Sequence, residues 1–147
     1  MQRSTAPSPD DYVAIQNLYA RYNLTSDAGD AEAYADCWTE DGELTIAHLE
    51  FSVRGRPALL AFKNRDKAGR RGAYRRHWNG SLYLEQVDAS TVRGRCYLQA
   101  FNGMPGNLPE LADVGVYDDL VVKTDGVWRF ARRSLAMDAS RWTPPSS

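Results

Sequence analysis

The first third of the chain shows helical spacing of apolar residues. They recur every three or four positions from residue 12 to residue 22, which predicts an amphipathic helix that ends near Asp27. Ser8 or Asp10 can cap its start, because a short polar side chain accepts a hydrogen bond from a free backbone N–H there. The apolar positions are Tyr12, Ile15, Leu18, Tyr19 and Tyr22.

Two shorter helices follow in the pattern. Gly29 fits a break, and Asp30 can cap a second helix over residues 31–38. Asp41-Gly42 indicates a turn, and residues 43–47 and 51–54 are short strand candidates. Pro57 fits the first turn of a third helix, whose apolar stripe is Leu59, Leu60 and Phe62.

After Gly72 the apolar period changes to two, which is typical of strands. Short connections at 88–90 and 124–126 predict hairpins, and 102–110 predicts a longer loop. Helices followed by an antiparallel meander indicate an α+β domain with its helices on one face of the sheet, and a bent sheet of that kind encloses a pocket. The four predicted strands are 76–87, 91–101, 114–123 and 127–137.

The 147 residues suit one domain, which we place at 9–139 between tails at 1–8 and 140–147. A polar N-terminus without an apolar h-region does not resemble a signal peptide, and no apolar run approaches the ~20 residues of a membrane span. The net charge of −1 argues against nucleic acid or anionic membrane as partners. Cys37 and Cys96 are expected to be buried thiols, which favours a cytoplasmic protein.

Several motifs resemble SnoaL-like, nuclear transport factor 2-like domains. AIQNLY at 14–19 and WTEDG at 38–42 are similar to the opening of that family, and GVYDDL at 115–120 and DGVWRF at 125–130 to its close. The resemblance covers about residues 10–138 and implies a cone-shaped fold around a pocket. Within the superfamily it is closest to the branch of hexachlorocyclohexane dehydrochlorinase, scytalone dehydratase and bile acid dehydratase.

That resemblance implies a catalytic dyad of His77 and Asp27, assisted by Arg133. A neutral histidine titrates near ~6.5 and can accept a proton, and a carboxylate on its other ring nitrogen fixes the tautomer. We therefore expect a base that removes a C–H proton before β-elimination. Strand alternation places Arg132 and Arg133 on opposite faces, and we prefer Arg133 for the pocket although a bulge would exchange them.

Four further residues are candidates for the pocket. Tyr22 lies about one helical turn before Asp27 and is a candidate catalytic residue, whose phenol can donate a hydrogen bond to a carbonyl or a leaving hydroxyl. Asn79 shares a strand face with His77 and is a candidate polar contact for the substrate. Trp38 and Tyr117 are candidate apolar walls.

Structural interpretations stay open beside these. His77 can be an ordinary strand residue, Asp27 simply a helix end, and Tyr22 a core residue, while His48 is expected at the surface. The basic cluster at 63–76 is a solvated face or a mouth that attracts a carboxylate, a phosphate or a coenzyme A thioester.

The expected activity is a cofactor-independent lyase of the dehydratase type on a small, largely apolar organic molecule. The spacing of histidines and cysteines indicates no metal site, and the sequence contains no phosphate-binding loop. An isomerase, a cyclase or a non-catalytic ligand-binding or accessory domain are the alternatives. We also expect a homo-oligomer, a trimer or a dimer, because alternation leaves apolar residues on both faces of the long strands.

Overall fold

The computed structural model describes residues 5–145, in which three helices pack against a six-stranded sheet. Of the tails expected at 1–8 and 140–147, residues 1–4 and 146–147 lie outside the described part. The helices are α1 (Pro9–Ala28), α2 (Ala31–Ala35) and α3 (Arg56–Gly69), with a 3-10 turn η1 (Ala47–Leu49). The strands are β1 (Trp38–Ile46), β2 (Phe51–Arg54), β3 (Tyr74–Asp88), β4 (Thr91–Gly103), β5 (Glu110–Thr124) and β6 (Val127–Ser140).

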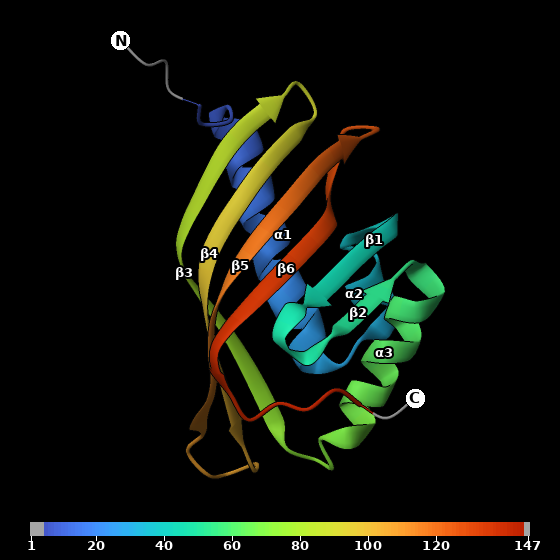
Figure 1. Ribbon diagram of the computed structural model, residues 1–147, viewed down its shortest axis with the longest axis vertical. Helices are drawn as coiled ribbons and strands as arrows, with labels where there is room; N and C mark the ends of the chain where they lie inside the picture. The colour runs from blue at the N-terminus through green and yellow to red at the C-terminus, as the bar shows by residue number, and fades with distance from the viewer. Residues whose placement is uncertain (1–4, 146–147) are drawn as a thin grey trace.

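The sheet is mixed and strongly curved, in the order β2-β1-β6-β5-β4-β3. Strands β1 and β6 are parallel, and every other neighbouring pair in this sheet is antiparallel. Figure 1 shows α1 running along one face of the long strands, with α2 and α3 beside β1 and β2. The predicted α+β architecture, with helices on one face of a bent sheet, is confirmed. No helix of the described chain is long and apolar enough to cross a membrane.

The ends of the first two helices follow from local chemistry. Ser8 caps α1, because its Oγ accepts a hydrogen bond from the backbone N–H of Asp11 at 3.2 Å. Gly29 closes α1 with a φ of 68°, a left-handed conformation that glycine adopts without steric cost. Asp30 then caps α2 by accepting from the N–H of Ala33 at 3.1 Å. Both predicted helix starts are confirmed.

The prediction for residues 31–42 is partly wrong. The second helix stops at Ala35, Trp38 already belongs to β1, and Asp41-Gly42 lie inside that strand. The register of β1 on β6 shifts in this stretch, so a bulge takes the place of the expected turn. Glycine is required at 42, because a Cβ there would lie 2.8 Å from the Trp38 ring.

The four long strands are where the alternation predicts them, each with a few additional residues at its ends. The connection between β5 and β6 is a two-residue hairpin at Asp125-Gly126. Both residues have positive φ, 51° and 77°, as a type I′ turn requires.

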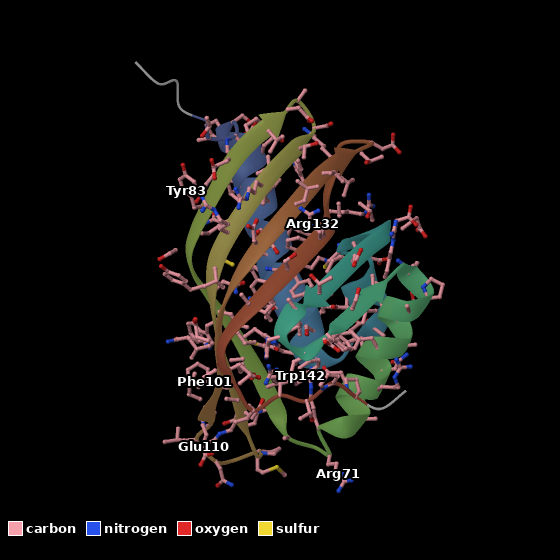
Figure 2. All side chains as sticks on the ribbon, viewed as in Figure 1. Arg71, Tyr83, Phe101, Glu110, Arg132 and Trp142 are labelled. Carbon is pink, nitrogen blue, oxygen red and sulfur yellow. The ribbon has the colours of Figure 1, made fainter. Side chains whose placement is uncertain are left out.

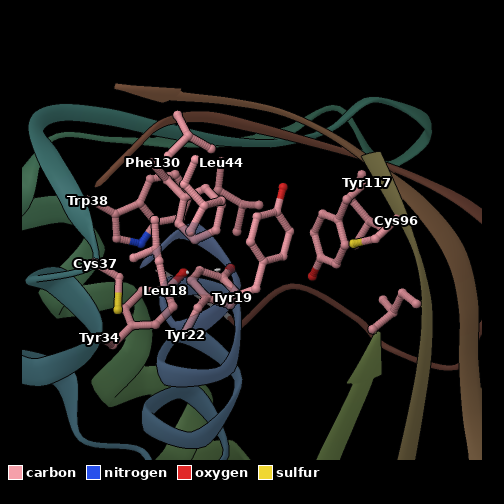
Figure 3. Packing of buried hydrophobic residues seen from close by; sticks show 14 of the residues in the cluster. Leu18, Tyr19, Tyr22, Tyr34, Cys37, Trp38, Leu44, Cys96, Tyr117 and Phe130 are labelled. Atoms are coloured by element: carbon pink, nitrogen blue, oxygen red, sulfur yellow. Dashed lines mark hydrogen bonds between the residues drawn. The ribbon is translucent and has the colours of Figure 1, made fainter. Parts of the chain in front are cut away.

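An aromatic cluster joins α1, α2, β1 and β6 at the centre of the molecule (Figure 3). The ring of Tyr22 lies 5.1 Å from Tyr34, 5.4 Å from Phe130 and 5.7 Å from Trp38, mostly edge to face. Such pairs add to the hydrophobic effect of burying the rings. The cluster fixes the C-terminal half of α1 on the sheet, and the candidate site lies beside it.

Candidate active site

A small cavity of about 50 Å³ lies between the helices and the inner face of the sheet. Its polar wall consists of residues from α1, α3 and β3, and aromatic rings and aliphatic side chains complete it. The volume holds a few water molecules, so a larger organic ligand requires lining side chains to move. The polar residues are Ser26, Lys63, Asp66, Arg75 and His77.

His77 and Asp27 form a hydrogen-bonded pair beside this cavity. Asp27 lies in the last turn of α1 and His77 near the start of β3. The His77 Nδ1 is 2.5 Å from Asp27 Oδ1, and the backbone N–H of His77 donates to Asp27 Oδ2 at 3.0 Å. Both side chains are about nine-tenths buried. The geometry therefore brings together the two residues that the resemblance singled out.

Arg70, the residue that follows α3, holds the helix end that carries Asp27. Its guanidinium donates to the carbonyl oxygens of Asp27 and Ser26 at 2.8 and 2.9 Å. The Ser26 carbonyl also accepts from the backbone N–H of Gly29 at 3.1 Å, and a cation at this helix end complements the helix dipole. Asp66 accepts from the same guanidinium at 2.7 Å. Asp27 is thus held from its backbone side as well as through its carboxylate.

The neighbours of His77 define its protonation. A carboxylate only accepts, so Nδ1 carries the proton that is shared with Asp27. Nε2 is then unprotonated, and it accepts a long hydrogen bond of 3.4 Å from the Nε of Arg75. Burial lowers the pKa of His77 below its ordinary value of 6.5, the charge of Arg75 acts in the same direction, and the hydrogen bond to Asp27 opposes both. The ring is therefore neutral at pH 7, with its lone pair at Nε2.

Arg75 is held by the neighbouring strands. Its guanidinium donates to Asp113 Oδ2 at 2.5 Å and to Asn102 Oδ1 at 2.9 Å. Asp113 also accepts from Ser140 Oγ at 2.5 Å. Arg75 is buried in an ion pair with strand β5, so it is a fixed part of the cavity wall.

Arg133 lies behind the cavity wall. It is fully buried in a two-bond ion pair with Asp119, at 2.9 and 3.0 Å, and Tyr19 donates to the same carboxylate. Its guanidinium lies over the rings of Tyr117 and Tyr22, 3.7 and 4.3 Å from their centres. Arg132 instead points to solvent (Figure 2), so the inward arginine is the expected one.

Both tyrosines expected at the pocket line the cavity. Tyr22 and Tyr117 are buried, and the hydroxyl of Tyr22 lies 3.3 Å from that of Tyr34. Burial raises the pKa of Tyr22 and Tyr117 above the usual value of 10, although the nearby charge of Arg133 opposes this. Both hydroxyls therefore keep their protons at neutral pH.

Asn79 and Trp38 do not line the cavity. Asn79 accepts a hydrogen bond from Asn23 of α1 at 2.8 Å, which ties β3 to the helix. Trp38 is buried in the aromatic cluster, with its ring against Tyr22. The other histidine, His48, is exposed in η1, as expected.

The sequence interpretation missed most of the residues that line the cavity, among them Lys63 and Trp142. Lys63 was part of a basic cluster, yet it is buried and its ammonium faces the polar wall. Its position four residues after Leu59, on the apolar stripe of α3, is the signal that could have found it. Trp142 was assigned to a tail, yet it packs on Phe51 and Phe62 and lines the cavity. Figure 2 shows it where the chain leaves β6 toward α3.

Among residues 5–145, no three His, Cys, Asp or Glu side chains lie together as metal ligands. Cys37 and Cys96 are buried free thiols.

The model of the SnoaL-like domain family matches residues 8–134. A protein of unknown function from Mycobacterium tuberculosis is 32% identical, with 94% of this chain and 82% of that chain covered and a TM-score of 0.76. LinA, a dehydrochlorinase, is 25% identical, with 94% of this chain and 90% of that chain covered and a TM-score of 0.74. A candidate scytalone dehydratase from Novosphingobium aromaticivorans is 24% identical, with 94% of this chain and 89% of that chain covered and a TM-score of 0.77. No curated protein sequence matches this chain.

Proposed function

Because the chain belongs to the SnoaL-like family, we propose that it is a cofactor-independent lyase of the dehydratase type, acting on a small organic molecule. Its structural neighbours include a dehydrochlorinase and a candidate scytalone dehydratase, which supports an enzyme-like function for this fold. Since one fold serves many functions, the specific reaction is argued from the residues of the cavity.

The observation that carries the proposal is the contact of 2.5 Å between His77 Nδ1 and Asp27 Oδ1, where His77 lines a small cavity. A buried neutral imidazole with a carboxylate on one nitrogen is a poised base at the other. A cavity that only binds apolar ligands gains nothing from such a pair and bears the cost of its desolvation.

In the proposed reaction, the substrate displaces the long hydrogen bond from Arg75, and Nε2 of His77 takes a proton from a carbon next to an activating group. The C–H electron pair forms a new carbon–carbon double bond as the bond to the leaving group on the next carbon breaks. The imidazolium, stabilised by Asp27, then gives its proton to a leaving hydroxide, which departs as water. A base of this kind contributes roughly 10²–10⁴-fold to the rate.

The remaining candidates take supporting roles. Tyr22 and Tyr117 keep their protons and line the cavity, so we propose them as hydrogen-bond donors to the substrate. Arg133 lies behind their rings and acts through them as a positioning residue. Trp38 and Asn79 do not contact the substrate in this proposal. Trp38 packs against Tyr22, and Asn79 ties β3 to α1.

We also propose that the chain works as a homo-oligomer. Trp78 and Tyr97 are 66% and 60% exposed on β3 and β4, which is unusual for aromatic side chains of a monomer. Light scattering coupled to gel filtration measures the mass, and a monomer at micromolar concentration contradicts this part of the proposal.

The test of the lyase is a turnover screen in D₂O with a panel of β-hydroxy ketones and vicinal chlorinated cycloalkanes, followed by mass spectrometry. We expect loss of one water or one hydrogen chloride with wild type and with His48→Gln, which changes the exposed histidine, and no turnover with His77→Gln. A shifted double bond without loss of mass indicates an isomerase, and ring closure a cyclase. Turnover by His77→Gln at the wild-type rate refutes the dyad as base.

A further inference from the structure

Lys63 is buried on the inner side of α3, and its environment is unusual for a lysine. The side chain is 4% exposed. Its Nζ donates to Ser26 Oγ at 2.8 Å and to Asp66 Oδ2 at 3.2 Å, and it lies 4.5 Å from the centre of the Tyr34 ring. Lysines are almost never fully buried without a specific reason.

We propose that Lys63 is a catalytic residue, an oxyanion-binding group for the carbonyl oxygen that activates the substrate. The inference rests on the proposed function and adds the substrate class to it: an aldehyde or ketone with a leaving group on the β carbon. Lys63 and His77 line the same cavity, one on α3 and one on β3. One substrate can therefore contact the base and the ammonium together.

The hydrogen bonds of Lys63 leave room for a ligand. An ammonium has three donors, and two are used by Ser26 and Asp66. Within residues 5–145 no hydrogen bond occupies the third donor, and the ammonium lies 4.5 and 5.1 Å from the ring centres of Tyr34 and Phe62 at the cavity. A carbonyl oxygen that enters the cavity is a stronger acceptor than an aromatic face.

Structural pairing does not account for the burial of Lys63. Asp66 already accepts from Arg70 at 2.7 Å, and Trp142 donates to its other oxygen at 3.3 Å. Removing the Lys63 ammonium would therefore leave Asp66 with a cation. Burying a second cation beside the same carboxylate costs free energy. That cation is useful in a site where negative charge develops on the substrate, because it stabilises this charge.

The positive charges near His77 also support an oxyanion site. Burial lowers the pKa of His77 most, and the charges of Arg75 and Lys63 lower it further. Burial also lowers the pKa of Lys63, to about 8, which leaves its amine mostly protonated at pH 7. An alkane without a carbonyl gains little from these cations, whereas an enolate is stabilised by them.

The steps balance with His77 as the only proton carrier. Nε2 takes the proton of the α carbon, the C–H pair becomes the α-carbon–carbonyl-carbon double bond, and the carbonyl π pair moves to the oxygen held by Lys63. The oxygen then returns its pair to reform the carbonyl. The enolate double bond becomes the α,β double bond, and hydroxide leaves the β carbon with the proton from His77.

Because an enolate does not persist, the probe is 4-nitrophenol, whose phenolate shares its negative charge between the phenolic oxygen and the nitro group and absorbs visible light. We expect wild type to bind the phenolate more tightly than neutral nitrobenzene, and Lys63→Met to lose roughly 10- to 100-fold of phenolate affinity with little change for nitrobenzene. Lys67→Met is the matched control, since Lys67 is exposed on the same helix. Lys63→Arg, which keeps the charge, should retain part of the preference.

Thermal unfolding establishes that each variant is folded, and Lys63→Gln replaces Lys63→Met if the latter is not. The inference is overturned if wild type shows no preference for the phenolate, or if the neutral variants at Lys63 keep it. His77→Gln should keep the preference, because the anion site does not need the base. A Lys63-dependent preference for the phenolate without any turnover therefore refutes the proposed lyase and supports the anion site. Turnover without that preference supports the lyase and refutes the anion site.

Discussion

Both carboxylate oxygens of Asp27 bind His77, one at the ring Nδ1 at 2.5 Å and the other at the backbone N–H at 3.0 Å. The second contact fixes the start of β3 to the end of α1, and the first orients the imidazole. A residue fifty positions away thus sets the position and the tautomer of the candidate base.

Replacing Asp27 by Asn tests the double contact. An amide offers one acceptor and one donor, so it cannot accept both N–H groups, and it favours the tautomer with the proton on Nε2. We expect kcat to fall by roughly 10²–10⁴-fold, measured on whichever substrate the turnover screen identifies. Asp41→Asn, at an exposed position of β1, is the control. A loss of less than about threefold would show that Asp27 has a structural role only.

The pH profile tests the state of the base. Burial lowers the pKa of His77 below 6.5, so kcat/KM should be constant near pH 7 and fall only below pH 6.5. Lys63 contributes to that lowering, so Lys63→Met should move the acid limb to higher pH. An acid limb above pH 6.5 in wild type contradicts the assignment.

The same shift affects stability. The unfolded chain takes up a proton at His77 near pH 6.5, whereas the folded chain does so only at lower pH, so folding loses stability as the pH falls below 6.5. Urea unfolding of wild type and His77→Gln at pH 7 and pH 5.5 should show the larger loss in wild type. An equal loss in both proteins would mean that other groups cause it.

The fold could be predicted from the sequence where a local pattern and tertiary packing agree. Alternation gives the four long strands, and Ser8 and Asp30 give two helix starts. The prediction failed at Trp38 and Gly42, where local propensity indicates a helix and a turn. There the pairing of β1 with β6 prevails, with the N–H of Phe130 bound to the carbonyl of Cys37 at 2.8 Å.

The candidate site was predictable only as far as a motif carried it. The resemblance singled out Asp27 and His77, and the geometry brings them into contact. The burial of Lys63 was not predicted, because the composition of a basic segment does not distinguish a buried lysine from a solvated one. Arg133 was expected at the pocket wall, but it lies behind that wall, paired with Asp119 and covered by the rings of Tyr22 and Tyr117. These tertiary contacts cannot be deduced from residue spacing.

Arg133→Met tests the buried ion pair behind the cavity. Removing one partner leaves Asp119 buried without its cation, which typically costs about 3–5 kcal/mol of unfolding free energy. Burial already raises the pKa of Asp119, so the variant should take up a proton there. Urea denaturation measures the loss, and Arg132→Met on the exposed face of β6 is the control, expected within about 0.5 kcal/mol of wild type. Equal stability of the two variants would contradict the importance of this pair.

The central claim, that His77 is a neutral base with its lone pair at Nε2, can be measured without any substrate. Nitrogen-15 NMR of the imidazole rings, with His77→Gln and His48→Gln for assignment, reports the proton on each ring nitrogen. At pH 7 we predict a proton on Nδ1 of His77, no proton on Nε2, which accepts from Arg75, and a pKa below 6.5. A His77 ring that is doubly protonated at pH 7, or that carries its single proton on Nε2, would contradict the account.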